Sequence, residues 1–175
     1  QQQADHIWQH LFIERSPISE ACRGVLTVLN KLGIDVTERN LNKIREYFAA
    51  TTVEQYVDTV FKTANCSSVI MTNDPFDDDE RPVWLEQGGE TDPRFQGVLR
   101  IDPLLIGWEQ AAKRLAEWGY DVKGDLGAGD LAAVRKFLSE WIDRMNARYL
   151  AVSLTPDFQY PEDSPCGKLI DECIL

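Results

Sequence analysis

Three short apolar runs, separated by segments of helical periodicity, constrain the fold of this chain more than any other feature. They are SVIMT (residues 68–72), GVLRI (97–101) and YLAVSL (149–154). Runs of this length and β-branched content are typical of strands covered on both faces. Strands that alternate with helices form right-handed βαβ units, and these units make a parallel sheet. The sequence therefore predicts an α/β fold with about three parallel strands.

The first third of the chain predicts helices alone. Apolar residues recur at helical spacing from Ser19 to Leu32, before Gly33. A second helix is expected after Thr37, which we interpret as its N-cap. A third is expected to begin at Thr52, because Gln55 stands three residues later, as in a capping box.

Two long helical segments lie between the second and third apolar runs. One begins at Asp102-Pro103, an arrangement typical of an N-cap followed by proline at the first helical position. The other runs from Asp130 to Met145. A last helix is expected within residues 166–175. A complete (β/α)8 barrel takes about 250 residues, so we expect a segment of a larger enzyme, with a small complete α/β domain as the alternative.

Composition excludes several classes of partner. The net charge of −11 argues against binding to a nucleic-acid backbone, which requires clustered Lys and Arg. No apolar run approaches the roughly 20 residues of a membrane span, and no secretory signal is visible. The four cysteines form no CxxC pair, which favours reduced thiols in a cytoplasmic protein.

Polar residues follow each of the three apolar runs. Ligands of parallel α/β folds bind at the carboxyl ends of the strands. The residues placed there are Thr72, Asn73 and Asp74; Arg100 and Asp102; and Ser153, Thr155 and Asp157. A guanidinium at a strand end suits a bidentate carboxylate ligand. A purely structural ion pair of Arg100 with Asp74 or Asp102 explains it equally well, and an N-cap role by itself accounts for Asp102.

The strongly acidic stretch at residues 76–94 shows no helical pattern, and we interpret it as a long loop or lid bordering a pocket. The two histidines, His6 and His10, stand four residues apart, but the glutamate of a zincin motif is missing. Histidines beside apolar residues are more often packing residues than metal ligands. We therefore predict no metal site in this chain and find no evident base or nucleophile.

Three segments resemble the uronate (glucuronate) isomerases. VIMTNDPFDDDERPVW is similar to a strand and acidic loop of that family, GVLRIDPLLIGW to its next strand, and HIWQHLFIER to a helix of its inserted helical region. The order and spacing of the segments agree over nearly the whole chain. Departures are Asn73 where the family usually has Asp, Ile101-Asp102-Pro103 in place of its Pro-Asp order, and the absence of the His-x-His metal motif.

The resemblance implies a segment of an amidohydrolase-superfamily (β/α)8 barrel that interconverts aldohexuronates and ketohexuronates. Residues 1–65 would be the inserted helical region, and residues 66–175 part of the barrel. Arg100, Asn73 and Asp74 would contact the substrate, a small sugar acid. The longer parent would hold a divalent metal such as zinc and supply the catalytic base, so this chain alone would be inactive.

Two other interpretations stay open, together with the oligomeric state, for which a homo-oligomer is one possibility. The chain could be a non-catalytic acidic α/β binding module acting through residues 76–94 or its Trp-rich helices. It could also be a divergent amidohydrolase with another substrate.

Overall fold

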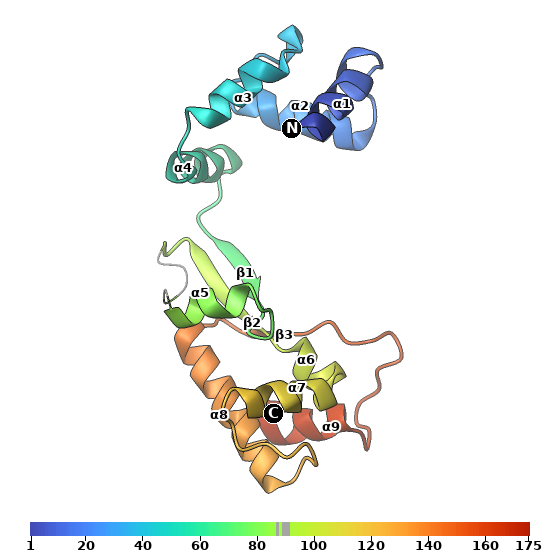
Figure 1. The fold of residues 1–175 in the computed structure, drawn as a ribbon, viewed down its shortest axis with the longest axis vertical. Helices are drawn as coiled ribbons and strands as arrows, with labels where there is room; N and C mark the ends of the chain where they lie inside the picture. Colours follow the sequence, from blue (N-terminus) through green and yellow to red (C-terminus); the bar gives the residue numbers. More distant parts are fainter. Residues whose placement is uncertain (87, 89–91) are drawn as a thin grey trace. The chain divides into compact units, whose positions relative to one another are not determined.

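The structure, a computed structural model, describes residues 1–86, 88 and 92–175. These residues form two compact units, residues 1–67 and residues 68–175 (Figure 1). We expected the helical region to end at residue 65. Within the described residues, no helix is long and apolar enough to cross a membrane.

The first unit contains helices only. Its elements are α1 (Gln2–Trp8) with a π-helical turn (Gln9–Ile13), α2 (Glu20–Lys31), a 3-10 turn (Val36–Glu38), α3 (Leu41–Ala49) and α4 (Val53–Ala64).

Two of the three predicted helix starts in this unit are confirmed. The hydroxyl of Ser19 accepts a hydrogen bond from the backbone N–H of Cys22 at the start of α2. Thr52 and Gln55 form the capping box of α4, each side chain accepting a hydrogen bond from the other residue's backbone N–H.

The predicted cap at Thr37 is wrong. The N-cap of α3 is Asn40, whose side-chain oxygen accepts hydrogen bonds from the backbone N–H groups of Asn42 and Lys43. Thr37 lies in the preceding 3-10 turn, and Arg39 ends that turn in the left-handed conformation, with φ of 50°. The backbone direction therefore changes between Thr37 and the helix.

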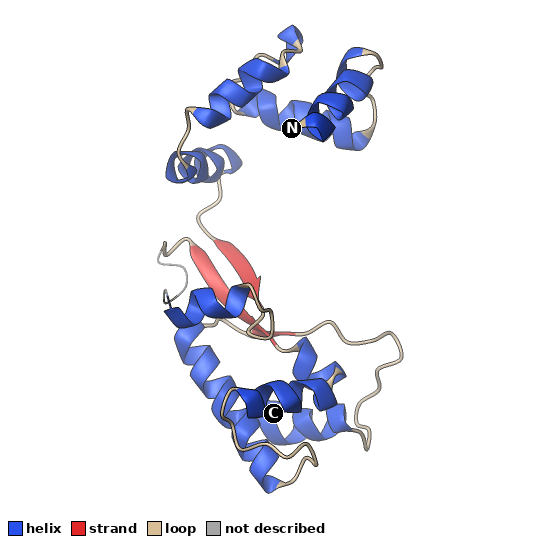
Figure 2. Cartoon of the chain, in the orientation of Figure 1, coloured by secondary structure: helices blue, strands red, loops and turns tan. Residues whose placement is uncertain are grey.

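The second unit is a mixed α/β structure around a three-stranded sheet (Figure 2). Its strands are β1 (Val69–Asn73), β2 (Phe95–Arg100) and β3 (Leu150–Ala151). Its helices are α5 (Glu80–Glu86), α6 (Asp102–Ile106), α7 (Trp108–Glu117), α8 (Ala128–Met145) and α9 (Pro165–Leu169), with a π-helical turn at Ile170–Ile174.

All strand pairs are parallel, in the order β1-β2-β3. At the carboxyl ends, Asn73 is in register with Leu99, and Arg100 with Ala151. The predicted parallel sheet of an α/β fold is thus confirmed, although β3 has only two residues where we expected six.

The expectation that the first strand is covered on both faces is wrong. Val69 and Ile70 of β1 are 40% and 49% exposed, whereas Val98 and Leu99 of β2 are fully buried. Within the described residues β1 pairs with β2 alone, and the core forms mainly between the end of β2 and helices α6 to α9. The position of β1 at the edge of the sheet therefore leaves Val69 and Ile70 exposed.

The predicted long helix from Asp102 is divided in two. Gly107, with φ of −142° and ψ of 42°, breaks it between α6 and α7. The two helices turn different apolar residues to the core, Leu104 from α6 and Leu115 from α7.

The interpretation of residues 76–94 as a long loop or lid without helix is also wrong for part of that range. Residues 80–86 form α5, where Trp84 is 6% exposed. A carboxylate oxygen of Asp77 accepts hydrogen bonds from the N–H groups of Asp79 and Glu80 and so stabilises the start of the helix. Residues 87 and 89–91 of the predicted loop lie outside the described residues.

Close backbone packing joins β2 to the end of α8. A Cβ atom added to Gly97 would lie 2.9 Å from the carbonyl oxygen of Met145. The absence of a side chain at Gly97 therefore lets the helix approach the strand, and it fixes β2 against the core.

Candidate functional site

The carboxyl ends of the parallel strands bring several of the predicted polar residues together. Asn73 ends β1, Arg100 ends β2, and Ser153 follows β3. Arg100 lies close enough to Asp74 for each charge to shift the pKa of the other. The strand order therefore assembles, at one edge, groups that are 80 residues apart in the sequence.

Arg100 forms a two-point ion pair with Asp102. Its Nε donates to Oδ2 of Asp102 at 2.8 Å, and its Nη2 to Oδ1 at 3.2 Å. The Asp102 side chain is 9% exposed and that of Arg100 is 44% exposed. The buried carboxylate thus holds one side of the guanidinium, while Nη1 makes no hydrogen bond within the described part of the chain.

Asp102 also binds the third strand segment. Its Oδ1 accepts a hydrogen bond from the backbone N–H of Ser153 at 2.9 Å. This contact overturns the prediction that Asp102 is an N-cap, because its carboxylate points to groups beyond its own helix. Ile101 stands at the N-cap position instead.

The charges of this pair shift both pKa values. The hydrogen bond and the charge of Asp102 raise the pKa of Arg100 above its already high value. Burial pushes the pKa of Asp102 upward, but the hydrogen bonds from Arg100 and Ser153 outweigh it, so the pKa is lowered. Both groups are charged at neutral pH.

Glu80, the first residue of α5, organises the end of β1. Its Oε2 accepts hydrogen bonds from Nδ2 of Asn73 at 3.3 Å and from the backbone N–H of Asp74 at 2.9 Å. Because the amide nitrogen faces Glu80, Oδ1 of Asn73 faces the other way. That oxygen is buried and has no hydrogen-bond partner among the described residues.

Asp74 is a half-buried carboxylate whose neighbours shift its pKa in opposite directions. Its Oδ1 accepts a hydrogen bond from the N–H of Phe76 at 2.8 Å. Burial raises its pKa, and the negative charges of Glu80 and Asp102 add to this effect, while Phe76 and Arg100 lower it in part. A carboxyl group with a raised pKa beside an arginine is a common feature of functional sites.

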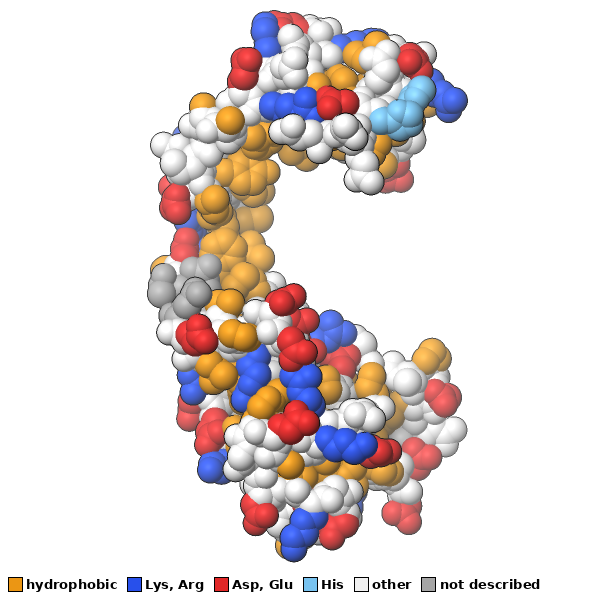
Figure 3. Space-filling model, viewed as in Figure 1, with side chains coloured by type: hydrophobic (Ala, Val, Ile, Leu, Met, Phe, Trp, Pro, Cys, Tyr) orange, Lys and Arg blue, Asp and Glu red, His pale blue; other side chains and the backbone are white. Residues whose placement is uncertain are grey.

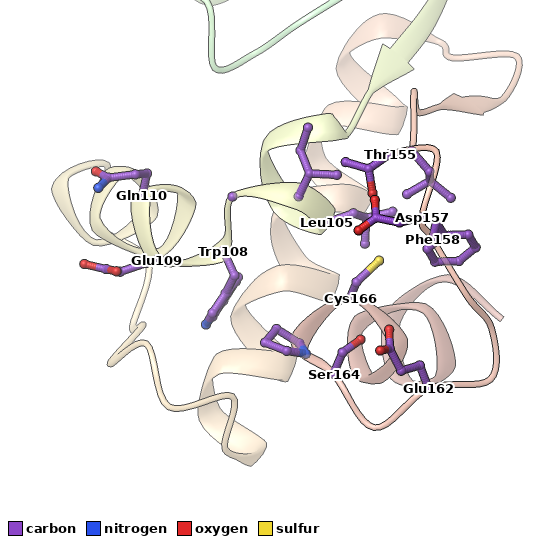
Figure 4. A pocket seen from close by; sticks show the side chains of 14 residues that line it. Leu105, Trp108, Glu109, Gln110, Thr155, Asp157, Phe158, Glu162, Ser164 and Cys166 are labelled. Carbon is purple, nitrogen blue, oxygen red and sulfur yellow. The ribbon is translucent and has the colours of Figure 1, made fainter.

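The structure does not bring the third predicted cluster wholly to this edge. Thr155 and Asp157 line a separate hollow of about 580 Å³, together with residues of α6, α7 and the segment before α9. In Figure 4, Cys166 and Ser164 lie across the hollow from Trp108 and Glu109. Of the cluster, only Ser153 contacts the Arg100–Asp102 pair.

Two charged residues, Glu80 at the strand ends and Asp130 at the start of α8, have roles that the sequence does not predict. Glu80 was treated as part of an acidic loop, although its position just after the Asp77 cap could have indicated a helix start. Asp130, expected only as a helix start, is 2% exposed and accepts hydrogen bonds from the N–H groups of Lys123, Gly124 and Leu126. It thereby folds the glycine-rich connection onto α8.

The described residues do not fit a conventional metal centre. No three side chains of His, Cys, Asp or Glu come together among them in a metal-binding arrangement. Asp74 and Asp102 are near one another, but Asp102 already neutralises Arg100.

The parallel sheet and the polar side chains at its carboxyl ends define the class of the second unit: part of a parallel α/β fold of the kind that binds ligands at this edge. Comparison with known structures specifies the class further. The chain is similar to a uronate isomerase from Bacillus halodurans C-125, with 53% sequence identity and a TM-score of 0.91. The match covers 98% of this chain and 40% of that chain. Neither models of protein families nor curated proteins gave a match.

The resemblance to uronate isomerases that the sequence indicates is thus confirmed. The chain is a uronate-isomerase-like segment that spans 40% of the length of the matched enzyme. This finding favours the enzyme segment over the acidic binding module that the sequence left open.

Proposed function

We propose that this chain forms part of a cytoplasmic uronate isomerase of the amidohydrolase superfamily. In this proposal its second unit contributes three strands to a (β/α)8 barrel, and the enzyme interconverts an aldohexuronate and a ketohexuronate. The observation that carries the proposal is Arg100: a half-exposed guanidinium held by Asp102 at the carboxyl end of a parallel strand, in a chain 53% identical to a uronate isomerase.

Arg100 is proposed to bind the carboxylate of the sugar acid. Asp102 uses Nε and Nη2, and the remaining side of the planar guanidinium can form charge-assisted hydrogen bonds to a second carboxylate. Because Asp102 is buried, the guanidinium is oriented before substrate arrives, which lowers the entropy cost of binding. Arg100 stays protonated and therefore binds or stabilises charge but does not act as an ordinary base.

Asn73 and Asp74 are proposed to contact hydroxyl groups of the same substrate. Oδ1 of Asn73 is an acceptor without a partner among the described residues, and because it is buried, a substrate hydroxyl reaches it only after neighbouring side chains shift. The Asp74 carboxylate lies near Arg100 and, among the described residues, accepts one backbone hydrogen bond, from the N–H of Phe76. A sugar acid offers both a carboxylate and several hydroxyl groups, which matches this set of partners.

Movement of a proton between adjacent carbons also requires an acid/base group and stabilisation of the enediolate-like charge. We propose that residues outside this chain supply the base and the ligands of a divalent metal, zinc being the first candidate. The part of this chain within the proposal is to bind and orient the sugar acid.

The test is an isomerase assay on the full-length protein that contains this chain, with D-glucuronate as substrate and ketohexuronate formation as the readout. We expect turnover in the wild type and, in Arg100→Met, a fall in kcat/KM of about 10- to 100-fold, carried mainly by KM, because a hydrogen-bonded charge pair contributes about 1.5–3 kcal/mol.

Arg135→Met is the matched control. Arg135 pairs with Glu172 at the surface, and its side chain is 49% exposed, so we expect unchanged kinetics. Absence of any uronate turnover in the wild type would overturn the proposed function. Equal kinetics in wild type and Arg100→Met would overturn the role of Arg100 alone.

A further inference from the structure

The two histidines of the chain lie together on the surface of the helical unit, contrary to the prediction that they are packing residues. The rings of His6 and His10 have centroids 4.3 Å apart and planes at 80° to one another. His6 is exposed, and the side chain of His10 is 45% exposed. Figure 3 shows the histidine side chains, in pale blue, open to solvent.

Glu14 fixes the orientation of the second ring. Its Oε2 lies 2.6 Å from Nδ1 of His10, and its Oε1 accepts a hydrogen bond from Nε2 of Gln9 at 3.1 Å. Since an ionised carboxylate only accepts hydrogen bonds, Nδ1 of His10 carries the proton. In the neutral ring, Nε2 of His10 then presents its lone pair.

The backbone contributes to this arrangement. Residues 9–13 form a π-helical turn, closed by a hydrogen bond from the N–H of Glu14 to the carbonyl oxygen of Gln9 at 2.9 Å. Such turns inside α-helices occur frequently at functional sites. Here the turn places His6, His10 and Glu14 along one side of the helix.

We propose that His6 and His10 form a two-ligand surface site for a late first-row divalent metal ion, with Glu14 as the hydrogen-bond partner that orients His10. Two imidazole rings bound to one ion at a right angle, through bonds of about 2.0 Å, have centroids roughly 4.4 Å apart. The observed separation agrees with this value. Water completes the coordination.

The ligand set selects the metal. Imidazole nitrogen suits Cu²⁺, Ni²⁺ and Zn²⁺, and right-angled coordination is typical of Cu²⁺ and Ni²⁺. Mg²⁺ and Ca²⁺ require oxygen ligands. A carboxylate bonded to the distal nitrogen of a ligating histidine is the usual partner in metal sites, and its loss typically weakens affinity 10- to 100-fold.

The experiment is a calorimetric titration of the 175-residue chain with NiCl₂, in a Cys66→Ser background because the Cys66 thiol is exposed. We expect one ion per chain and no binding of Mg²⁺. His6→Ala and His10→Ala should each weaken Ni²⁺ binding at least tenfold, and Glu14→Gln by 10- to 100-fold. Gln3→Ala, an exposed change in the same helix, should leave the affinity unchanged.

A second readout is the electron paramagnetic resonance spectrum with one equivalent of Cu²⁺. Hyperfine coupling of the Cu²⁺ electron spin to two imidazole nitrogens supports the site. Loss of one coupled nitrogen in each His variant identifies His6 and His10 as the ligands. Circular dichroism checks that the variants keep their helices. Undiminished Ni²⁺ affinity in the double variant His6→Ala/His10→Ala, or no binding by the wild type, would overturn the proposal. Unchanged affinity in Glu14→Gln would overturn the role of Glu14.

Discussion

The Nε atom of Arg100 lies 2.8 Å from Oδ2 of Asp102, in an ion pair whose acidic member is buried and whose basic member is half exposed. Asp102 also binds the N–H of Ser153, and so the pair connects the ends of β2 and β3. One carboxylate therefore both holds the Arg100 guanidinium and connects the ends of two strands.

Replacement of Asp102 by Ala is expected to lower the free energy of unfolding by about 1.5–3 kcal/mol at pH 7, because Ser153 loses its acceptor and Arg100 its partner. Urea denaturation of the chain measures this. Asp102→Asn, which keeps one acceptor oxygen, should lose less. Equal stability of Asp102→Ala and wild type would contradict the structural role.

The pH dependence of Asp102 has a definite sign. Its folded-state pKa is lowered, so its contribution to stability is present above the unfolded pKa of about 3.9 and is lost as pH falls through the folded value. Urea midpoints measured from pH 7 down to pH 2 should fall less steeply in Asp102→Asn than in the wild type. Parallel curves would show that Asp102 does not contribute to acid sensitivity.

Asp74 is expected to behave in the opposite way, because its folded-state pKa is raised. Stability should fall as pH rises from the unfolded pKa through the folded one, since the folded state disfavours the charged form. Asp74→Asn, which keeps the acceptor for the N–H of Phe76, should therefore raise the urea midpoint at pH 7 but not at pH 3. A lower midpoint at pH 7 would contradict the prediction.

Asp130 is expected to be the most sensitive carboxylate of the second unit. Asp130→Ala removes the partner of three backbone N–H groups from a side chain that is 2% exposed, and we expect a loss of about 3 kcal/mol or more. The control is Asp125→Ala, which removes the acceptor of one exposed hydrogen bond from the N–H of Gly127. A loss of about 1 kcal/mol in the free energy of unfolding is expected. Similar denaturation midpoints for the two variants would argue against the buried role of Asp130.

Substitution of Gly97 and of Gly129 by Ala is expected to change stability in opposite directions. Gly97→Ala places a methyl group 2.9 Å from the carbonyl oxygen of Met145, and we expect a loss of about 1–3 kcal/mol from overpacking. Gly129→Ala lies in the first turn of α8, where the new Cβ would meet no side chain and no backbone atom beyond its own helix turn within 4 Å, and a gain of roughly 0.5–1 kcal/mol is expected. Thermal unfolding of both variants tests the opposite signs.

Features governed by neighbours in sequence could be predicted from the sequence. The capping box of Thr52 with Gln55 involves groups three residues apart and is present, and the helical pattern predicted from Ser19 begins there, with Ser19 as the N-cap. The parallel sheet follows from alternation of strands and helices. The position of Arg100 at a strand end follows from its place in an apolar run.

Features governed by tertiary contacts could not be predicted in this way. Asp102 has every local property of an N-cap, yet its carboxylate binds Ser153, 51 residues later. Helix α5 could not be predicted from its acidic sequence, because the burial of Trp84 that stabilises it depends on contacts with distant parts of the chain. The roles of Asn73, Asp74 and Arg100 toward a substrate stay predictions.

The exposure of β1 has a practical consequence for handling this chain by itself. Among the described residues, one edge of β1 has no partner strand, and Val69 and Ile70 present apolar surface beside it. Such an edge is a template for strand addition between molecules. The average molar mass measured by light scattering should therefore rise with concentration, and the charged substitution Ile70→Lys should suppress this self-association without disturbing the buried strand β2.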